Sequence, residues 1–298
     1  MSLDQLPLLH RGKVRDCYLV GTDRLLLVAS DRLSAFDVVM AEPIPDKGRI
    51  LTAMTAYFLE TVADVAPSAL VAVDPAELVD AVPELGDAVG WQGRTMLMAR
   101  AEMLPLECIV RARLAGQAFT EYAAHGTIHG EPAPSGLQLA EAFPEPRFTP
   151  STKAESGHDQ NISFAEAVAL VGPEMASAAR AMSLAVFARA SAALSSAGLV
   201  LADTKFELGL VGGELVLCDE VCTPDSSRIW PAGEIVLGET PPAFDKQPFR
   251  DWLESEGWDK QPPAPPVPEA VIAETAARYR SAYEQVTGRS LDDWYGAQ

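Results

Sequence analysis

The sequence predicts a mixed α/β fold in two lobes, with a smaller β-rich lobe over residues 1–100 and a larger α/β lobe over residues 101–298. Two observations support this prediction. Short runs rich in aliphatic residues flank glycine-containing turns, which is typical of antiparallel hairpins. Two longer segments in the second half repeat apolar residues at helical spacing, which indicates two long helices.

The first lobe is expected to open with a β-hairpin, because two β-rich runs flank a turn that contains Gly21. The acidic stretch at residues 71–93 lacks a clear pattern, so its secondary structure stays open. The expected elements of this lobe are strands at residues 14–20, 24–30 and 95–101 and a helix near residues 51–65.

The second lobe is expected to combine a second hairpin with the two long helices. Pro173 suits the first turn of one helix, and Gly198 suits its C-terminal end. Prolines are dense between residues 130 and 152, which excludes regular helix and predicts a long ordered loop. The expected elements are strands at residues 107–114, 199–202, 207–211 and 215–221 and helices at 173–197 and 269–287, the first strand being joined to strand 95–101 through residues 103–105.

The composition is that of a globular protein and argues against nucleic-acid binding. The chain has 298 residues, of which 48% are hydrophobic, and 23 basic against 42 acidic residues give a net charge of −19. A general nucleic-acid binder needs a basic surface, although a few local cations can build a phosphate site on an acidic protein. Neither a long apolar run nor a signal-peptide pattern occurs, so we expect a cytoplasmic protein.

The cysteines do not form a recognisable metal or disulfide framework. Cys17, Cys108, Cys218 and Cys222 match no zinc spacing pair, and two thiolates at a C-x3-C spacing cannot complete a tetrahedral zinc shell. We expect them to be buried free thiols.

The segment Gly12-Lys13-Val14-Arg15 is a candidate phosphate site. Glycine lets a backbone approach an anion closely, and Lys13 and Arg15 supply positive charge. The segment lacks the second glycine and the Lys-Ser/Thr pair of a Walker loop. A solvent-exposed turn is the alternative interpretation.

Carboxylates on the second hairpin are candidates for binding a hard divalent cation. A two-residue turn pairs Val211 with Glu214. Glu207 then lies opposite Cys218, and Asp219 faces the other way. A three-residue turn with a bulge instead places Glu207 opposite Asp219, at roughly 5 Å between Cβ atoms. Only a bulged register makes a shared metal site straightforward, and a polar surface facing solvent is the alternative.

Arginines mark two further candidate sites. Arg111 and Arg113 alternate onto one face of an expected strand, where they need anionic partners from the protein or from a substrate. Arg228 follows Ser226 and Ser227, and an arginine beside hydroxyl groups is a good phosphate receptor. Turn chemistry also explains this last segment.

A loop at residues 153–159 carries charges of both signs. From the residues alone, His158 is open to three interpretations: a proton carrier, a ligand donor or a structural loop histidine. Local hydrogen bonds that merely anchor the loop are the alternative interpretation.

These segments occur together in a fixed order, and with them the chain resembles the SAICAR synthetase family. The resemblance extends from about Gly12 to Gly288. Residues 244–252 and the proline-rich residues 261–268 resemble the longer form of the family. The matching segments are Gly12–Asp16, Ser34–Asp37, Glu107–Arg111, Lys153–Asp159, Asp203–Glu207 and, most specific of all, Asp219–Trp230.

The resemblance implies a two-lobed ATP-grasp-like or kinase-like fold with ATP between the lobes. It also implies a ligase of purine biosynthesis that joins L-aspartate to the carboxylate of 5-amino-1-(5-phosphoribosyl)imidazole-4-carboxylate, a carboxyaminoimidazole ribonucleotide, through an acyl phosphate. ATP is the implied co-substrate and Mg²⁺ the implied cofactor. The expected partners are these small molecules, without nucleic acid or membrane, and a monomer is slightly favoured over a homodimer.

The resemblance further implies residue roles. Position 117, often Ser in the family, is Gln here, which leaves its contact with the ribonucleotide phosphate open. The amine proton goes either to Asp159 or to a substrate oxygen. The assigned residues are Gly12, Lys13, Val14, Arg15, Arg100, Glu102 and Met103 for ATP, Glu207 and Asp219 for ATP and its metal, Arg111, Gln117, Asp225 and Arg228 for the ribonucleotide, Lys153, His158 and Asp159 for aspartate, and Lys13, Asp219 and Asp159 for catalysis.

Two other functions remain as alternatives. A kinase for a small metabolite would share the phosphate segment and the metal-binding acids but would not require aspartate. A non-catalytic nucleotide sensor would keep Lys13 but has no need for Glu207, Asp219 and Arg228 together.

Overall fold

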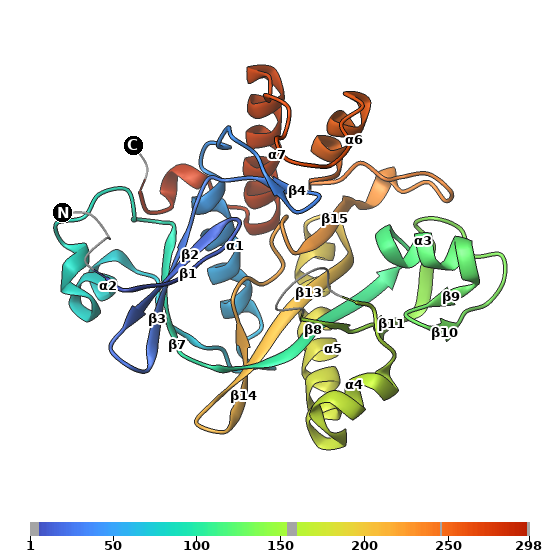
Figure 1. Cartoon of the computed structure of the whole chain (residues 1–298), viewed down its shortest axis with the longest axis horizontal. Helices are drawn as coiled ribbons and strands as arrows, with labels where there is room; N and C mark the ends of the chain where they lie inside the picture. Colours follow the sequence, from blue (N-terminus) through green and yellow to red (C-terminus); the bar gives the residue numbers. More distant parts are fainter. Residues whose placement is uncertain (1–5, 154–159, 245, 297–298) are drawn as a thin grey trace.

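The computed structural model of the chain describes residues 6–153, 160–244 and 246–296. These residues form two principal antiparallel sheets, with helices packed on them (Figure 1). The mixed α/β class that the sequence predicts is therefore confirmed. Among the described residues, none of the helices combines the length and the apolar character that crossing a bilayer needs.

The first sheet has the strand order β1-β2-β3-β7-β6 and is built entirely before residue 100. Strands β2 and β3 pair from Arg15 with Ala29 to Val20 with Arg24, so the predicted hairpin is confirmed. The turn residue Gly21 has a φ of 63°, which glycine adopts at low cost. The strands are β1 (Leu8–Arg11), β2 (Arg15–Val20), β3 (Arg24–Ala29), β6 (Leu70–Ala72) and β7 (Thr95–Ala99).

The second sheet has the order β11-β8-β13-β14, with β12 also paired to β8 and β15 also paired to β13. Its central strand β13 is a single strand that joins two runs predicted as separate strands. The strands are β8 (Glu102–Arg113), β11 (Ala142–Phe148), β12 (Ser151–Thr152), β13 (Leu199–Val211), β14 (Glu214–Cys218) and β15 (Ser227–Pro231).

The long helices build one core that both halves of the chain share. Helix α5 packs against β13 and β8, and α1 packs against α7 and α5. Phe58 of α1, Phe187 of α5 and Phe206 of β13 are fully buried in the same apolar cluster. The division into lobes at residue 100 stays a prediction. The long helices are α1 (Lys47–Thr61), α5 (Pro173–Ser196) and α7 (Glu269–Thr287).

The remaining elements are short. The stretch left open at residues 71–93 contains the end of β6, helix α2 and a 3-10 turn, and Asp74 caps α2 by accepting from the amides of Ala76 and Glu77. The short helices are α2 (Pro75–Ala81), α3 (Gly116–His125), α4 (Phe164–Val171) and α6 (Gln247–Ser255), with 3-10 helices at Pro83–Leu85, Ala232–Glu234 and Leu291–Asp293. The short strands are β4 (Ser34–Ala35), β5 (Val38–Val39), β9 (Thr127–Ile128) and β10 (Glu131–Pro132).

Two loop predictions are wrong, and proline placement explains both. Residues 103–105 lie inside β8 rather than in a connection, because Pro105 falls where the pairing with β13 shifts register. Residues 142–148 form strand β11 despite Pro144 and Pro146, because β11 is an edge strand with its own register shift. Bulges and sheet edges are where a strand tolerates proline.

Helix α1 begins at Lys47, before the predicted start at residue 51. Polar residues and a glycine hid this first turn, since they break the apolar repeat. In the structure Lys47, Gly48 and Arg49 are all buried. A Cβ atom built on Gly48 would lie 2.5 Å from the carbonyl oxygen of Ala29, so the helix can approach β3 only because it has no side chain there.

Candidate active site

Charged side chains from both sheets converge between β2, β13 and the end of β14. Arg15 of β2, which is 7% exposed, forms ion pairs with Asp219 and Glu220 just beyond β14. Lys153 pairs with Glu207 of β13. The sequence-predicted residues Arg15, Lys153, Glu207 and Asp219 are thus brought to one place.

The hairpin between β13 and β14 has the two-residue turn. Val211 pairs with Glu214, and Glu207 lies opposite Cys218. The bulged register, which the sequence left open, is therefore excluded. Asp219 nevertheless reaches the site because it follows the strand with a left-handed φ of 55°, so its direction is no longer set by strand alternation.

Glu207 lies in a strongly cationic setting. Burial alone would raise the pKa of Glu207, but Lys153, Lys205 and Arg15 together hold that pKa below its usual value. Lys205 reaches the neighbouring strand, where its Nζ lies 2.5 Å from Oε1 of Glu107. Glu207 therefore stays ionised while largely buried, which is the state that a hard cation needs.

The turn between β1 and β2 contains the predicted phosphate segment. The amide of Gly12 donates to the carbonyl of Arg15 at 2.8 Å, and a Cβ atom on Gly12 would lie 2.7 Å from that oxygen. Arg32 donates to the carbonyls of Gly12 and Lys13, at 3.1 Å each. Lys13 itself is exposed and pairs with Asp37 at 2.5 Å. The turn is thus rigidly held while its lysine stays accessible.

The connection between the sheets passes over an apolar surface. The amide of Arg100 donates to the carbonyl of Asp23 at 2.7 Å, and Gly209 of β13 lies directly under residues 101–103. A Cβ atom on Gly209 would lie 2.8 Å from that of Ala101 and 3.2 Å from Sδ of Met103. Apolar side chains of both sheets meet beside it: Leu27, Ala69, Met96, Met98, Val216 and Cys218.

A second group of charges lies further along β13. Asp203 accepts from Nη1 of Arg111 at 2.7 Å and from Nη1 of Arg228 at 2.8 Å, and all but 4% of Asp203 is buried. Gly116 packs against Arg228, since a Cβ atom there would lie 2.3 Å from Nη2. One carboxylate thus accepts hydrogen bonds from two guanidinium groups.

Asp225 lies beside this cluster with cations of its own. It accepts from Nζ of Lys47 at 2.7 Å and from Tyr279 at 2.5 Å, and it pairs with Lys246 at 3.0 Å. Burial would raise the pKa of Asp225, but Lys246 and Lys47 hold it far below its usual range. Asp225 is therefore an ionised carboxylate that orients two lysines.

A cavity of about 90 Å³ opens between the two groups. The cavity has room for a group the size of a tetrahedral oxyanion. Its lining is mostly polar and cationic: Asp203, Pro224, Asp225, Ser226, Ser227, Arg228, Lys246 and Arg250.

Other predicted residues lie elsewhere. Gln117 is exposed on the first turn of α3 and is not among the residues that line the 90 Å³ cavity. Arg113 points to the carbonyl of Ala140, at 2.8 Å. His158 and Asp159 lie outside the described residues. The sequence assigned no role to Lys47 or Lys246, and assigned none to Arg250 of α6.

The sequence did not single out His129 either, although it lies buried near Arg111. Its Nδ1 lies 3.0 Å from the carbonyl of Pro150, while Nε2 has no partner within the described part of the chain. Burial, reinforced by the charge of Arg111, lowers the pKa of His129 to about 4. His129 is therefore neutral at physiological pH.

Stability is expected to depend on pH through His129. Below pH 6.5 the unfolded chain binds a proton that the folded chain does not bind until about pH 4. The free energy of unfolding is therefore expected to fall by about 2 kcal/mol between pH 7 and pH 5 through this group alone. Denaturant titrations at the two pH values measure this loss. The variant His129→Asn should not show the loss that His129 causes, and asparagine tolerates the left-handed backbone at this position. An equal loss in both proteins would contradict the prediction.

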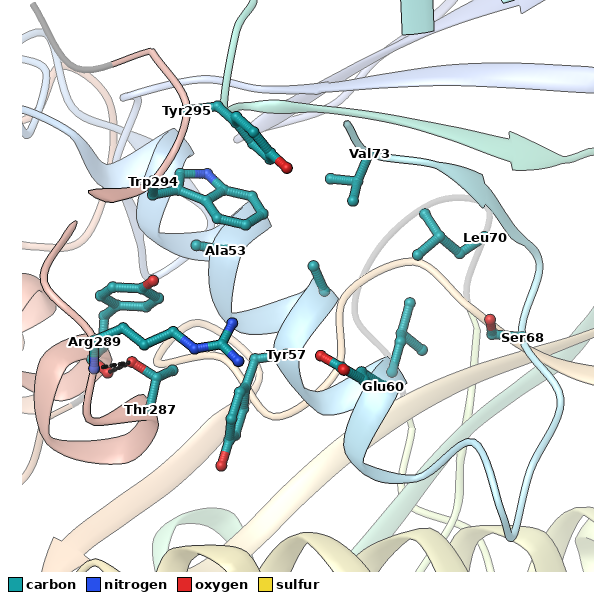
Figure 2. A pocket seen from close by; sticks show the side chains of 13 residues that line it. Ala53, Tyr57, Glu60, Ser68, Leu70, Val73, Thr287, Arg289, Trp294 and Tyr295 are labelled. Atoms are coloured by element: carbon teal, nitrogen blue, oxygen red, sulfur yellow. Dashed lines mark hydrogen bonds between the residues drawn. The ribbon is translucent and has the colours of Figure 1, made fainter. Parts of the chain in front are cut away.

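A larger pocket, of about 350 Å³, lies away from these charges, between α1, β6 and the C-terminal segment (Figure 2). Tyr57 and Glu60 of α1 line it together with Arg289 and Trp294. None of the residues that the sequence assigns to substrates lines this pocket.

Comparisons with known proteins identify the family of the chain. The family model described as SAICAR synthetase matches residues 8–265. A phosphoribosylaminoimidazole-succinocarboxamide synthase from Saccharopolyspora erythraea is 47% identical, covering 99% of this chain and 98% of that protein. The structure described as SAICAR-synthase from Saccharomyces cerevisiae complexed with SAICAR superposes with a TM-score of 0.88 at 37% identity, covering 96% of both chains.

A more distant structure, a SAICAR synthetase in complex with ADP, superposes with a TM-score of 0.70 at 21% identity, covering 94% of this chain and 98% of that one. At this identity the likeness establishes the fold alone. The family model and the near relatives cover almost the whole length, and the sequence motifs lie together in the structure. The chain therefore belongs to the SAICAR synthetase family, a family of ligases in purine biosynthesis.

Proposed function

We propose that the chain uses ATP and Mg²⁺ to join L-aspartate to the carboxylate of 5-amino-1-(5-phosphoribosyl)imidazole-4-carboxylate, through an acyl phosphate. One observation carries this assignment. Asp203, Lys205 and Glu207 alternate onto one face of β13. Asp203, which pairs with the two arginines, and Glu207, which lies among the acidic residues, are therefore about 13 Å apart along one strand. A phosphate-donor site and an acceptor site would then adjoin on one sheet.

The acceptor site suits the ribonucleotide. Its phosphate fits the 90 Å³ cavity, where Arg228, Ser226 and Ser227 can donate hydrogen bonds to it. Asp225 keeps the two lysines beside the cavity in place. The imidazole carboxylate would then extend along β13 toward Glu207.

The donor site suits ATP. The apolar surface beneath residues 100–103 can receive a planar base, and Lys13 and Arg15 can hold the phosphates. The donor set also fits Mg²⁺, because Glu207 is ionised and both carboxylates are held by cations in this structure. Glu207 and Asp219 would hold the ion, and the ion would neutralise negative charge on the phosphates. Within the described residues, however, no cluster of three or more acidic, His or Cys side chains has metal-binding spacing.

This arrangement supports the following reaction. The imidazole carboxylate attacks the γ-phosphorus of ATP, and ADP leaves with Lys13 and Arg15 stabilising its charge. The neutral amine of aspartate then displaces phosphate from the acyl carbon and forms the amide bond. The amine proton passes to Asp159 or to a substrate oxygen. Lys153, with His158 and Asp159, is proposed to bind aspartate.

A product assay tests this function. ADP and phosphate release should require the ribonucleotide, aspartate and ATP together, and chelation of Mg²⁺ should stop it. ADP release without aspartate would instead indicate a small-metabolite kinase.

Arg228→Lys is expected to raise the KM for the ribonucleotide about tenfold while leaving the KM for ATP nearly unchanged. Lysine keeps the charge but loses the planar fork that binds an oxyanion and Asp203 together. Arg113→Lys is the control, because it makes the same substitution at an arginine of β8 that does not line the cavity. A raised KM for ATP with an unchanged one for the ribonucleotide would contradict this role.

A further inference from the structure

The end of the described chain crosses back to the first sheet as a strap, defined here as residues 291–296. Nε1 of Trp294 donates to the carbonyl of Gly93 at 2.8 Å, and the hydroxyl of Tyr295 donates to Asp74 at 2.9 Å. Figure 2 shows Trp294 beside Ala53 of α1, with Tyr295 next to Trp294. The strap thus links α7 to the loop before β7 and to α1.

Two glycines make the contact between strap and loop a backbone contact. A Cβ atom on Gly93 would lie 2.0 Å from the carbonyl oxygen of Tyr295, and one on Gly296 would lie 2.3 Å from that of Gln92. Neither position accommodates a side chain without displacing the strap. The strap is therefore fitted to this loop rather than resting loosely on it.

Arg49 of α1 holds the strap from the other side. Its side chain is 5% exposed. It donates to three strap carbonyls, those of Leu291 at 3.1 Å, Trp294 at 3.0 Å and Tyr295 at 2.9 Å. Its Nη1 donates to Asp46 at 2.8 Å. Because a buried guanidinium without partners is costly, the position of Arg49 depends on the strap.

The two residues before Arg49 hold functional elements. Nζ of Lys47 donates to Asp225 beside the anion-sized cavity, and the amide of Gly48 donates to Asp31 just after β3 at 2.9 Å. Successive helix residues rise only about 1.5 Å, so a displacement of Arg49 also displaces Lys47. The phosphate turn lies between β1 and β2, and Arg32 holds it by donating to the carbonyls of Gly12 and Lys13.

We propose that the strap positions Lys47 against Asp225 through Arg49, which makes Arg49 a positioning residue for ribonucleotide binding. The proposal rests on the proposed function, because it takes the cavity beside Asp225 as the ribonucleotide site. Loss of the strap contact should weaken ribonucleotide binding while sparing the ATP site.

Gly93→Ala tests the proposal, with Gly90→Ala as its matched control. Both glycines lie in the same loop with φ near 72–75°, so alanine brings a similar backbone strain to each. Only at Gly93 does the new methyl group strike the strap, since nothing lies within 4 Å of a Cβ atom on Gly90. We expect Gly93→Ala to raise the KM for the ribonucleotide about tenfold and to change the KM for ATP less than twofold. Gly90→Ala should change neither.

Arg49→Lys perturbs the same contact from α1 and should give the same split between the two KM values. The double variant should show no more than the larger single effect, because both changes break one connection. An unchanged ribonucleotide KM in Gly93→Ala, parallel increases for all substrates, or a hundredfold effect in the double variant would each overturn the proposal. If the unaltered enzyme forms no product from the ribonucleotide, the proposed function fails instead.

Discussion

Replacing Asp219 by Asn is expected to lower kcat about a thousandfold, which corresponds to about 4 kcal/mol of transition-state stabilisation. Asp219 lies past the end of β14 and faces Arg15 of the other sheet, at the point where both sheets present charge. The change removes one negative charge and keeps the shape. Asn also tolerates the left-handed backbone at this position, so the fold should be retained.

Steady-state rates at increasing Mg²⁺ concentration measure this effect, and thermal unfolding checks that the variant is folded. Glu214→Gln is the matched control, because Glu214 is an exposed carboxylate at the other end of the same strand. Activity of Asp219→Asn within tenfold of the unaltered enzyme at saturating Mg²⁺ would remove Asp219 from the catalytic machinery.

Apolar repeats, prolines and glycines within a short stretch of sequence were sufficient to predict the long helices α5 and α7 and the two hairpins. Helix α7 has the predicted ends at Glu269 and Thr287, with Gly288 in the left-handed conformation after it, because an apolar repeat and a C-terminal glycine define it. Helix α5 likewise follows Gly172 and begins at Pro173. The two hairpins could be predicted because a turn that contains glycine lies between two short β-rich runs in each of them.

Elements set by their neighbours could not be predicted in this way. Strand β11 contains prolines and is strand only because β8 offers it an edge. The first turn of α1 is buried by contacts with β3, Asp225 and the strap, all remote in sequence. From the local sequence alone, its polar residues are therefore typical of a loop.

The same distinction applies to the candidate site. Motif segments pointed to Arg15, Glu207, Asp219, Asp225 and Arg228 as candidates, because each segment carries its chemistry within a few residues. Lys47 was missed because its partner Asp225 lies far away in the sequence. Asp203 received no separate role from its sequence segment, and in the structure it pairs with Arg111 and Arg228. Strand pairing, which places Asp203 beside Arg111 and Arg228, decides this role.

Asp203→Asn is expected to lower the free energy of unfolding by about 3–5 kcal/mol. Asp203 is the carboxylate between Arg111 and Arg228, and Arg111 is 4% exposed. The amide removes the negative charge that these two guanidinium groups share. A surface pair offers the control: Asp64→Asn breaks the exposed contact with Arg189 and should cost at most about 1 kcal/mol.

The ligand should reverse part of this loss, and this separates a structural arginine pair from a ligand-binding one. If Arg111 and Arg228 bind the ribonucleotide phosphate, the phosphate supplies the missing negative charge. Its addition should then raise the melting temperature more in Asp203→Asn than in the unaltered enzyme, since stabilisation follows affinity for the folded state. Thermal unfolding with and without saturating ribonucleotide measures both gains. A gain in the variant that is equal to or smaller than that of the unaltered enzyme would mean that the arginine pair does not receive the phosphate.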